Sequence, residues 1–399
     1  MATPYKTFSN YTFGCKVNFA DSSYIGRELI NRGYSQVPIE SFSDICLINT
    51  CSVTEKADKK AKRLIKSIHK KFPTTKIIVY GCYAQLKPDD IINMKGVSCV
   101  VGDEEKFNIG NILDDNTISE KKYVSKISDS EKFTISYSLN ERVRAFIKIQ
   151  DGCGYNCSYC TIPNARGRSR SSSINKTIEE IKNIVDQGSK EIILSGINIG
   201  DFGYQYNENL AQLLEEIELI EGLKRYRISS IEPNLLNNEI LKIISCSKKA
   251  MPHLHIPLQS GSDKILRLMK RRYSSSDYYR TIQSVKKYLP NSCVGVDTIV
   301  GFPSESEEDF NKTYELLNDL DISYLHVFSY SERDNTDAEK ISPKVQNDII
   351  SFRRNKLRLL SNHKYNQFIE KNIDHNSTIL FEQYNKGILS GWTDNYIRV

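Results

Sequence analysis

The sequence lacks the long apolar segments of membrane-spanning and secreted proteins. None of its 399 residues belongs to an unbroken apolar run of the roughly 18 residues that a membrane helix needs. No apolar run of the signal-peptide type stands near the N-terminus. We therefore expect no membrane association and a cytoplasmic location. Internal repeats and low-complexity tracts are also missing, and the length predicts two or three domains.

Positive charge is only mildly in excess. The net charge is +6 and the pI is about 8.6, which is a weak bias toward polyanions. The cationic residues gather in three stretches, 56–71, 166–170 and 267–272. Most runs of this kind are solvated helix faces, and the lysines of 56–71 stand opposite an apolar stripe, as such a face requires.

Cysteine is plentiful, with 10 residues in the chain. In a cytosolic protein, such cysteines indicate metal binding or catalysis rather than disulfides. Six of them form two sets of three. The compact set, Cys153, Cys157 and Cys160, lies in the run Cys-Gly-Tyr-Asn-Cys-Ser-Tyr-Cys and has a C-x3-C-x2-C spacing. The dispersed set is Cys15, Cys51 and Cys82, each just after an apolar strand-like run.

Three thiolates favour an iron–sulfur cluster over zinc. A structural zinc site usually takes four protein ligands, and no fourth cysteine or histidine lies beside the compact set. Three cysteines leave one iron of a four-iron cluster without a protein ligand, and such an open position is where chemistry occurs. The other four cysteines, Cys46, Cys99, Cys246 and Cys293, are predicted to be small buried hydrophobes.

Residues 1–122 predict a parallel α/β sheet domain. Short apolar runs alternate with helical patterns, and the expected strands are Tyr11–Phe13, Ile45–Ile48, Ile77–Tyr80 and Val97–Val101. Ser52 and Glu55 have capping-box spacing, so we expect a helix to begin right after Cys51. The carboxyl ends of parallel strands share one sheet edge. The dispersed cysteines are therefore predicted to converge there.

The rest of the chain predicts a linker, a barrel and a β segment. Residues 123–141 are polar and without a period, which is typical of a linker. Residues 142–371 carry six further strand–helix units and predict an open (β/α)6 partial TIM barrel, since a closed barrel has eight. Residues 372–399 form a short β segment, with expected strands at Ser377–Glu382 and Tyr396–Val399. The expected barrel strands are Val143–Ile149, Glu191–Leu194, Arg225–Ile228, His253–Leu258, Val294–Val300 and Tyr324–Phe328.

The compact set resembles the signature of radical S-adenosylmethionine (SAM) enzymes, including an aromatic residue, Tyr159, before the last cysteine. In that family the open iron binds SAM, and reductive cleavage of SAM releases a 5′-deoxyadenosyl radical. The protein then has to place that radical and exclude water.

Further stretches are similar to the methylthiotransferase family. They include Gly14-Cys15-Lys16-Val17-Asn18, Asn49-Thr50-Cys51 and Gly81-Cys82, one around each dispersed cysteine. The stretch Ala165-Arg166-Gly167-Arg168-Ser169-Arg170 resembles the branch that acts on threonylcarbamoyladenosine in tRNA. So do Ser195-Gly196-Ile197-Asn198, Ser229-Ser230-Ile231-Glu232-Pro233 and Pro257-Leu258-Gln259-Ser260-Gly261-Ser262.

The resemblance implies two 4Fe–4S clusters and a defined reaction. The compact set would hold the radical cluster, and the dispersed set an auxiliary cluster that carries the sulfur to be inserted. One SAM methylates that sulfur, and a second yields the radical. Carbon 2 of N6-threonylcarbamoyladenosine, next to the anticodon, would then exchange hydrogen for a methylthio group.

Three other functions stay open. Two share the mechanism and act on isopentenyladenosine in tRNA or on an aspartate of a ribosomal protein. The third belongs to another class, a non-catalytic iron–sulfur protein for RNA binding or electron transfer, which would not cleave SAM.

The resemblance also implies roles for residues around the radical cluster. The cofactor-binding candidates are Tyr159, Gly196, Ser229, Glu232 and Gln259, and the alternative for Gly196 and Glu232 is a turn at a strand end. Three arginines that follow the cluster, Arg166, Arg168 and Arg170, are candidates for binding RNA phosphates.

The expected partners are a tRNA anticodon loop and an electron donor protein, and we expect a monomer. Residues from Ile379 to Tyr396 resemble the start of a TRAM domain, a small RNA-binding β-barrel whose later strands are missing here.

Overall fold

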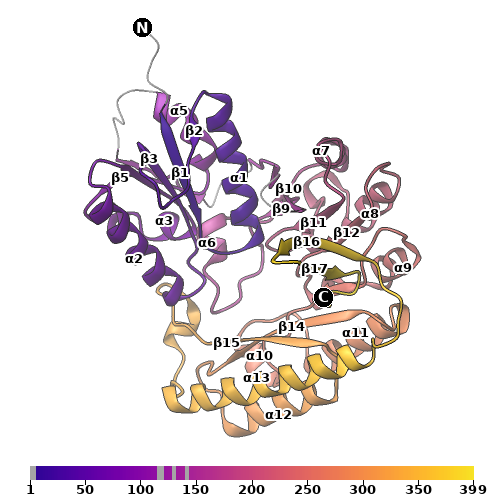
Figure 1. The fold of residues 1–399 in the computed structure, drawn as a ribbon. Coiled ribbons are helices and arrows are strands. Elements are labelled where there is room, and N and C mark those ends of the chain that lie inside the picture. The colour runs from indigo at the N-terminus through magenta and orange to yellow at the C-terminus, as the bar shows by residue number, and fades with distance from the viewer. Residues whose placement is uncertain (1–5, 115–120, 128–131, 140–142) are drawn as a thin grey trace. The chain divides into compact units, whose positions relative to one another are not determined.

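The computed structural model describes residues 6–114, 121–127, 132–139 and 143–399, and Figure 1 shows the path of the chain. These residues separate into two compact units. Unit 1 takes its residues from 1–139, 146–155 and 160–172, and unit 2 from 140–145, 156–159 and 173–399. No helix among the described residues is both apolar and long enough to cross a lipid bilayer.

Unit 1 is built on a six-stranded sheet in which every pair is parallel. The predicted parallel α/β sheet is therefore confirmed. In sheet order the strands are β2 (Ser35–Gln36), β1 (Thr7–Thr12), β3 (Ile45–Thr50), β4 (Lys76–Gly81), β5 (Val97–Val101) and β6 (Lys122–Tyr123). The helices between them are α1 (Lys16–Asn31), α2 (Glu55–Lys71), α3 (Cys82–Leu86), α4 (Pro88–Ile92), the 3-10 helix η1 (Glu105–Asn108) and α5 (Ile109–Asp114).

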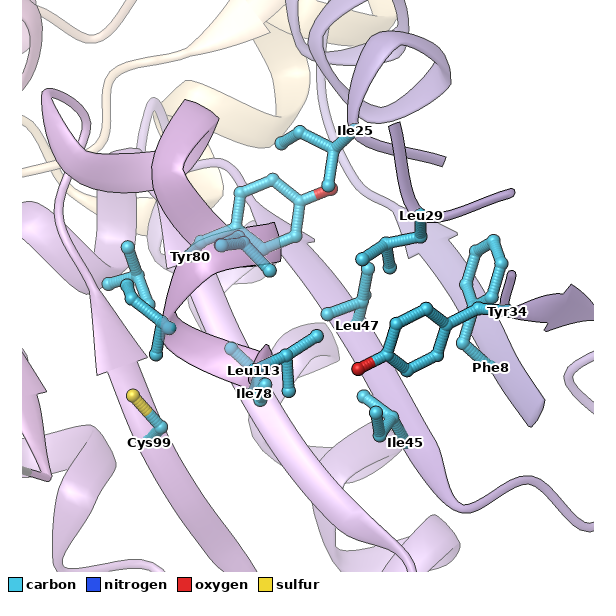
Figure 2. Close-up of a cluster of buried hydrophobic side chains, with 13 residues drawn as sticks. Phe8, Ile25, Leu29, Tyr34, Ile45, Leu47, Ile78, Tyr80, Cys99 and Leu113 are labelled. Atoms are coloured by element: carbon cyan, nitrogen blue, oxygen red, sulfur yellow. The ribbon is translucent and has the colours of Figure 1, made fainter. Parts of the chain in front are cut away.

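Side chains alternate along the strands, so each face of the sheet has its own apolar core. One face packs Leu47 and Ile78 against α1 and α5, with Leu29 of α1 among its buried residues, as Figure 2 shows. The other face packs Ile48 and its neighbours against α2. Because both faces are covered, β3 and β4 read as continuous apolar runs in the sequence. Burial of each large aliphatic side chain contributes about 1.5–3 kcal/mol.

Two local predictions in unit 1 are wrong. The first strand ends at Thr12 rather than spanning Tyr11–Phe13. Its polar side chains are satisfied inside the unit; Ser9, for example, bonds to the Ser43 hydroxyl at 2.9 Å. The helix after Cys51 begins at Glu55 and is capped by Thr54, whose side chain accepts from the Ala57 N–H.

The predicted linker contains structured residues. Ser136–Tyr137 form β7, which pairs antiparallel with Ile147 and Lys148 at the end of β8 (Arg144–Lys148). Residues 128–131 and 140–141 of the predicted linker lie outside the described residues. Further on, β9 (Gln150–Asp151) pairs antiparallel with β10 (Arg170–Ser171), and α6 spans Ile162–Arg166.

Unit 2 contains parallel strands that alternate with helices, and together with β8 these are the six strands that the sequence predicts for residues 142–371. Strand β11 pairs with β12, and β13, β14 and β15 form a three-stranded sheet in that order. Isolated parallel bridges, such as Ser230 with His255, join the β12 and β13 segments. The strands are β11 (Glu191–Ser195), β12 (Arg225–Ile228), β13 (His253–His255), β14 (Cys293–Val300) and β15 (Tyr324–Ser329).

The α-helices of unit 2 follow the strands in sequence, which is the pattern of a parallel α/β protein. In Figure 1, α13 runs alongside α12 at the edge of this unit. The helices are α7 (Ile174–Asp186), α8 (Leu210–Glu218), α9 (Asn238–Cys246), α10 (Asp263–Leu268), α11 (Ser275–Tyr288), α12 (Glu307–Asp319) and α13 (Asn347–Glu370). The short 3-10 helices are η3 (Ile199–Asp201), η4 (Tyr204–Tyr206), η5 (Pro233–Leu235) and η6 (Asp337–Lys340).

The C-terminal segment is an antiparallel hairpin of β16 (Ile379–Asn385) and β17 (Ile388–Thr393). The second strand was predicted at Tyr396–Val399 and is instead β17. The hairpin end is held against β12. There Arg227 donates to the Thr393 and Asp394 carbonyls at 2.8 and 2.7 Å.

Candidate functional site

The dispersed cysteines follow three adjacent strands of the unit 1 sheet. Cys15 is the N-cap of α1, just beyond β1. Cys51 directly follows β3, and Cys82 directly follows β4 as the first residue of α3. Since these strands are neighbours and parallel, their carboxyl ends meet at one sheet edge. The structure thus brings the dispersed set to one edge, as the sequence indicates.

Charge effects show how closely these thiols lie. Burial, together with the nearby Cys82 and Cys15, raises the pKa of Cys51 to about 12. Burial also raises the pKa of Cys82, while the Arg166 guanidinium opposes that rise. Three thiolates so near one another need a compensating positive charge. Iron supplies such charge when it binds deprotonated cysteines, so the donor set fits an iron–sulfur cluster.

Hydrogen bonds from side chains to the backbone fix the loops that carry these cysteines. Asn18 donates to the carbonyls of Phe13 and Thr50 at 2.8 and 3.2 Å, linking the segments before Cys15 and Cys51. Thr50 donates in turn to the Tyr80 carbonyl at 2.6 Å, which links the β3 and β4 ends. These hydrogen bonds therefore tie the segments that carry Cys15, Cys51 and Cys82 to one another at the sheet edge.

Gly14 allows the closest approach between two of these loops, and its replacement gives a first prediction. Its φ is +107°, and an added Cβ would lie 2.8 Å from Cys51 Cβ and 3.3 Å from Cys51 Sγ. We expect Gly14→Ala to reduce iron bound by the dispersed set several-fold, because the Cys51 sulfur must shift. Iron quantitation on the reconstituted protein measures the loss.

Gly33→Ala is the matched control, since Gly33 also has a positive φ, +89°, but nothing lies within 4 Å of an added Cβ. It shares the backbone strain of about 1 kcal/mol without the collision. Equal iron loss in both variants would contradict the steric explanation.

A buried cluster of charges lies in unit 1 close to Cys82. Lys106 contacts Asp21 at 2.7 Å and Asp103 at 2.6 Å. Lys148 contacts Asp21 at 2.8 Å. Burial alone would raise the pKa of Asp21, but Lys106, Lys148 and Arg166 outweigh it and lower that pKa to about 2. The Asp21 carboxylate is therefore ionised, and the cluster joins α1, η1 and the end of β8.

Arg166 and Arg170 belong to this charge cluster. The Arg166 guanidinium donates to Asp151 at 2.8 Å and to the Cys82 sulfur at 3.3 Å. Arg170 lies 3.6 Å from Asp103, and both arginine side chains are buried. Neither guanidinium is presented to solvent, so they do not support the RNA-contact prediction. Arg168 is the exposed one of the three, and its contact with RNA stays a prediction.

The compact set lies in the loop after β9, and its three residues are divided between the two units. Cys153 and Cys160 belong to unit 1, and Cys157 belongs to unit 2. In unit 1 the Cys153 N–H donates to the Gly167 carbonyl at 3.0 Å, and the Tyr155 N–H donates to the Cys153 sulfur at 3.4 Å. Backbone donors to sulfur favour the thiolate form that binds iron.

In unit 2 the loop is fixed by Ser158 and Tyr159. The Ser158 N–H and hydroxyl donate to the carbonyls of Met269 and Leu268 at 3.1 and 2.7 Å. Tyr159 packs edge-on to Phe302 at 6.3 Å and against the core cluster around Met269. In this structure Tyr159 therefore anchors its loop.

Arg271 is the residue of this site that the sequence interpretation missed. Its guanidinium donates to the Cys157 sulfur at 3.2 Å and forms an ion pair with Glu232. It also donates to the Tyr273 hydroxyl at 3.0 Å, which in turn donates to the Leu258 carbonyl. The basic run at 267–272 was the available signal, but most runs of this kind are solvated helix faces.

The remaining cofactor candidates lie at carboxyl ends of strands in unit 2. Gly196 directly follows β11, and Ser229 directly follows β12. Among the described residues the Ser229 hydroxyl is buried without a hydrogen-bond partner, which fits a ligand that supplies one. Gln259 follows the β13 segment with φ of +67°, and its N–H donates to the Asp297 carbonyl at 2.8 Å. Burial raises the pKa of Glu232, against the lowering effect of Arg271.

The other cysteines split between two environments. Cys46, Cys99 and Cys293 are buried as predicted, but Cys246 is exposed. Cys246 is the last residue of α9, and its side chain is exposed to solvent rather than packed in the apolar core. The prediction for Cys246 is wrong.

The cysteine loop comes before a series of parallel strands that alternate with helices. This order is typical of a radical SAM enzyme. Residues 147–317 match the family model described as the radical SAM superfamily, and residues 7–102 match the uncharacterized protein family UPF0004. Among solved structures, the radical SAM methyltransferase TsrM from Kitasatospora setae has a TM-score of 0.60 at 12% identity. That match covers 81% of this chain and 73% of TsrM, and it shows the fold.

Curated relatives show which kind of radical SAM enzyme this chain is similar to. A "Threonylcarbamoyladenosine tRNA methylthiotransferase MtaB" from Aquifex aeolicus is 36% identical, over 97% of this chain and 95% of its own. The protein of the same name from Bacillus subtilis is 35% identical, over 98% and 90%. A "tRNA-2-methylthio-N(6)-dimethylallyladenosine synthase" from Thermodesulfovibrio yellowstonii is 33% identical, over 86% and 80%.

The chain belongs to the radical SAM methylthiotransferase family, in its threonylcarbamoyladenosine tRNA methylthiotransferase branch. It is an enzyme of that class. Membership implies a 4Fe–4S cluster and SAM as cofactors.

Proposed function

We propose that this enzyme converts N6-threonylcarbamoyladenosine, next to the anticodon of tRNA, into its 2-methylthio derivative. The observation that carries the proposal is the presence of two cysteine trios, one beyond three adjacent strands of unit 1 and one in the radical SAM loop. Relatives that bear the name of this activity match nearly the whole chain. The proposal includes a tRNA anticodon loop as substrate, an electron donor protein, a monomeric state and a cytoplasmic location.

Two clusters are part of the proposal. Cys153, Cys157 and Cys160 would hold one, and Cys15, Cys51 and Cys82 the other. When bound, the first cluster with SAM supplies a 5′-deoxyadenosyl radical, and the second supplies the sulfur. The chain's own residues must bind the cofactor, keep the thiolates charged and hold the adenine in place.

Contacts in unit 2 support a role for several residues in these tasks. Arg271 donates to the Cys157 sulfur at 3.2 Å and so holds this cysteine of the radical loop in place. Its ion pair with Glu232 aligns that carboxylate for a hydroxyl or ammonium donor of the cofactor. The unpartnered Ser229 hydroxyl offers a further hydrogen bond, and Gly196 and Gln259 complete the proposed pocket. Tyr159 keeps the loop in position against Phe302.

We also propose that four segments of the chain have separate functions, as the sequence suggests. Residues 1–122 would bind the auxiliary cluster, 123–141 would connect, 142–371 would form the radical SAM core, and 372–399 would contribute to RNA binding. Arg168 is proposed to contact the RNA backbone, because its side chain is exposed beyond the radical loop.

The test is conversion of unmodified substrate by reconstituted enzyme. Anaerobically reconstituted protein, a reductant and SAM are incubated with tRNA from cells that lack the gene, and nucleosides are analysed by mass spectrometry. We expect 2-methylthio-threonylcarbamoyladenosine to appear, with 5′-deoxyadenosine released. Cys157→Ala is the inactive control, because it removes a ligand of the radical cluster.

Other outcomes would replace the proposal. Methylthiolation of dimethylallyladenosine alone would assign the substrate of the Thermodesulfovibrio relative. Iron without any 5′-deoxyadenosine release would indicate a non-catalytic iron–sulfur protein.

A further inference from the structure

Arg166 reaches the sheet edge of unit 1 that carries the dispersed cysteines. It is the last residue of α6, the short helix that begins just after Cys160. Its side chain is only 1% exposed, and its Nε–H donates to the Cys82 sulfur at 3.3 Å. Arg166 therefore belongs to the interior of unit 1, where it contacts a proposed cluster ligand.

The other two nitrogens of the Arg166 guanidinium also have partners. The Nη2 atom donates to the side-chain oxygen of Asn18, and the Nη1 atom donates to Asp151 at 2.8 Å. Asn18 in turn donates to backbone carbonyls in the segments before Cys15 and Cys51. Arg166 is thus bonded directly to one of the three cysteines and, through a single residue, to the segments that carry the other two.

Arginine suits this position because its guanidinium donates in several fixed directions within one plane. A lysine ammonium carries the same charge on a flexible chain and has no such fork. Burial alone would raise the pKa of Asp151, but Arg166, Lys148 and Lys106 hold that pKa well below its ordinary value. The ionised Asp151 therefore fixes the orientation in which the guanidinium meets the Cys82 sulfur.

The charge cluster around Arg166 has more basic groups than carboxyl groups. Its buried members are Lys106, Lys148, Arg166, Arg170, Asp21, Asp103 and Asp151. A buried charge without a partner is strongly unfavourable. An anion at the neighbouring Cys82 would supply the missing negative charge, and three thiolates around a four-iron core form such an anion. The composition of the charge cluster therefore fits an iron–sulfur cluster at this sheet edge.

We propose that Arg166 is a positioning residue of the auxiliary cluster: it holds the three cysteine segments together and, through its N–H bond to the Cys82 sulfur, raises the reduction potential of that cluster. The inference rests on the second cluster of the proposed function. Reduction adds an electron to the iron–sulfur core, so a hydrogen bond to a ligand sulfur and a nearby positive charge stabilise the reduced form. Burial strengthens this effect, because the interior screens charge less than water does. This role replaces the RNA contact that the sequence suggested for Arg166.

The test measures the reduction potential of the auxiliary cluster in the whole chain with Cys157→Ala, a change that removes the radical cluster. Reconstituted protein with about four iron atoms per chain is titrated with a low-potential reductant and redox mediators, and EPR follows the reduced cluster. We expect Arg166→Gln to shift the midpoint to a more negative potential. Arg166→Lys keeps the charge but not the fork, so its shift should be intermediate.

Arg170→Gln is the matched control, because it removes one positive charge from the same buried charge cluster. The hydrogen bonds of Arg170 go to the backbone carbonyls of Lys132, Arg166 and Arg168 rather than to a cysteine sulfur. Its substitution is expected to shift the potential less than Arg166→Gln does. Iron content, measured on each preparation, shows that the cluster is present.

A second measurement needs no substitution at Arg166. Protein is prepared with arginine that carries the heavy nitrogen isotope, again with Cys157→Ala, and the reduced cluster is examined by pulsed EPR. We expect a nitrogen coupling, because the Arg166 Nε atom is one hydrogen bond away from a ligand sulfur. Arg166→Lys, in the same labelled protein, should lose it.

Three results would overturn the inference while the proposed function stands. One is an unchanged potential in Arg166→Gln that keeps its iron. Another is an equal shift in Arg170→Gln, which would assign the effect to the charge cluster as a whole. If Arg166→Gln holds no iron, the labelled protein decides, and the third result is the absence of an arginine nitrogen coupling. Absence of any iron in the Cys157→Ala protein would instead overturn the second cluster of the proposed function, and this inference with it.

Discussion

Replacing Cys82 with alanine is expected to separate the two halves of the reaction. Bound iron should fall from about eight to about four per chain, because one of two four-iron clusters loses a ligand. Release of 5′-deoxyadenosine should persist, while methylthiolated nucleoside falls below detection. The physical reason is that Cys82 belongs to the unit 1 edge, whereas the ligands of the radical cluster lie in the loop after β9.

The measurements are iron and sulfide content, 5′-deoxyadenosine, and nucleoside mass spectrometry on the same preparation. Cys99→Ala is the matched control, since Cys99 is a fully buried cysteine of the same sheet and belongs to an apolar cluster. It should keep all the iron. Loss of 5′-deoxyadenosine release in Cys82→Ala would contradict a separate role for the auxiliary cluster, and unchanged iron would contradict the ligand assignment.

Replacing Asp21 with asparagine is expected to destabilise unit 1 by about 3–5 kcal/mol, the usual cost of breaking a buried ion pair from one side. Asp21 is fully buried and contacts Lys106 and Lys148 at 2.7 and 2.8 Å. It also accepts a hydrogen bond from the Ser136 hydroxyl at 2.6 Å. An amide leaves two buried ammonium groups short of a counter-charge.

Denaturant unfolding of the iron-free protein measures this change without the contribution of metal binding. Asp114→Asn is the control, because Asp114 pairs with Arg32 at the surface, where its side chain is 50% exposed. Exposed pairs contribute about 0–1 kcal/mol. A loss below about 1 kcal/mol for Asp21→Asn would show that the charge cluster relaxes or admits water.

The parts of the fold that the sequence predicts well are those set by burial. Strands β3 and β4 are covered on both sides, so their apolar runs are unbroken and their ends are easy to place. The same ends position Cys51 and Cys82, and the sheet edge follows from parallel pairing. This part of the candidate site needed only the strand pattern and the cysteine positions.

The parts that the sequence does not predict depend on partners far along the chain. Strand β1 is polar because its side chains bond to other segments, and Ser9 bonds to Ser43. Capping residues close in sequence compete, and Thr54 rather than Ser52 caps α2, while Ser52 donates to Asp58 at 3.1 Å. Local spacing fits both options and cannot choose between them.

Arginine roles were the hardest to predict. Arg166 and Arg271 look alike in sequence, as members of basic runs, yet each is buried against a cysteine sulfur. Only the folded chain shows that Asp151 and Glu232 pair with them. A basic run beside a cysteine cluster therefore predicts charge compensation of the thiolates as readily as a surface for RNA.

The hairpin at the end of the chain carries a natural optical reporter. Trp392 is the sole tryptophan of the sequence. Its indole stacks on Tyr396 at 4.3 Å and donates to Glu382 at 2.9 Å. Tyr396 in turn stacks on His253, the first residue of β13. Indole emission therefore follows separation of this hairpin from β12 and β13, without labelling and without emission from a second indole.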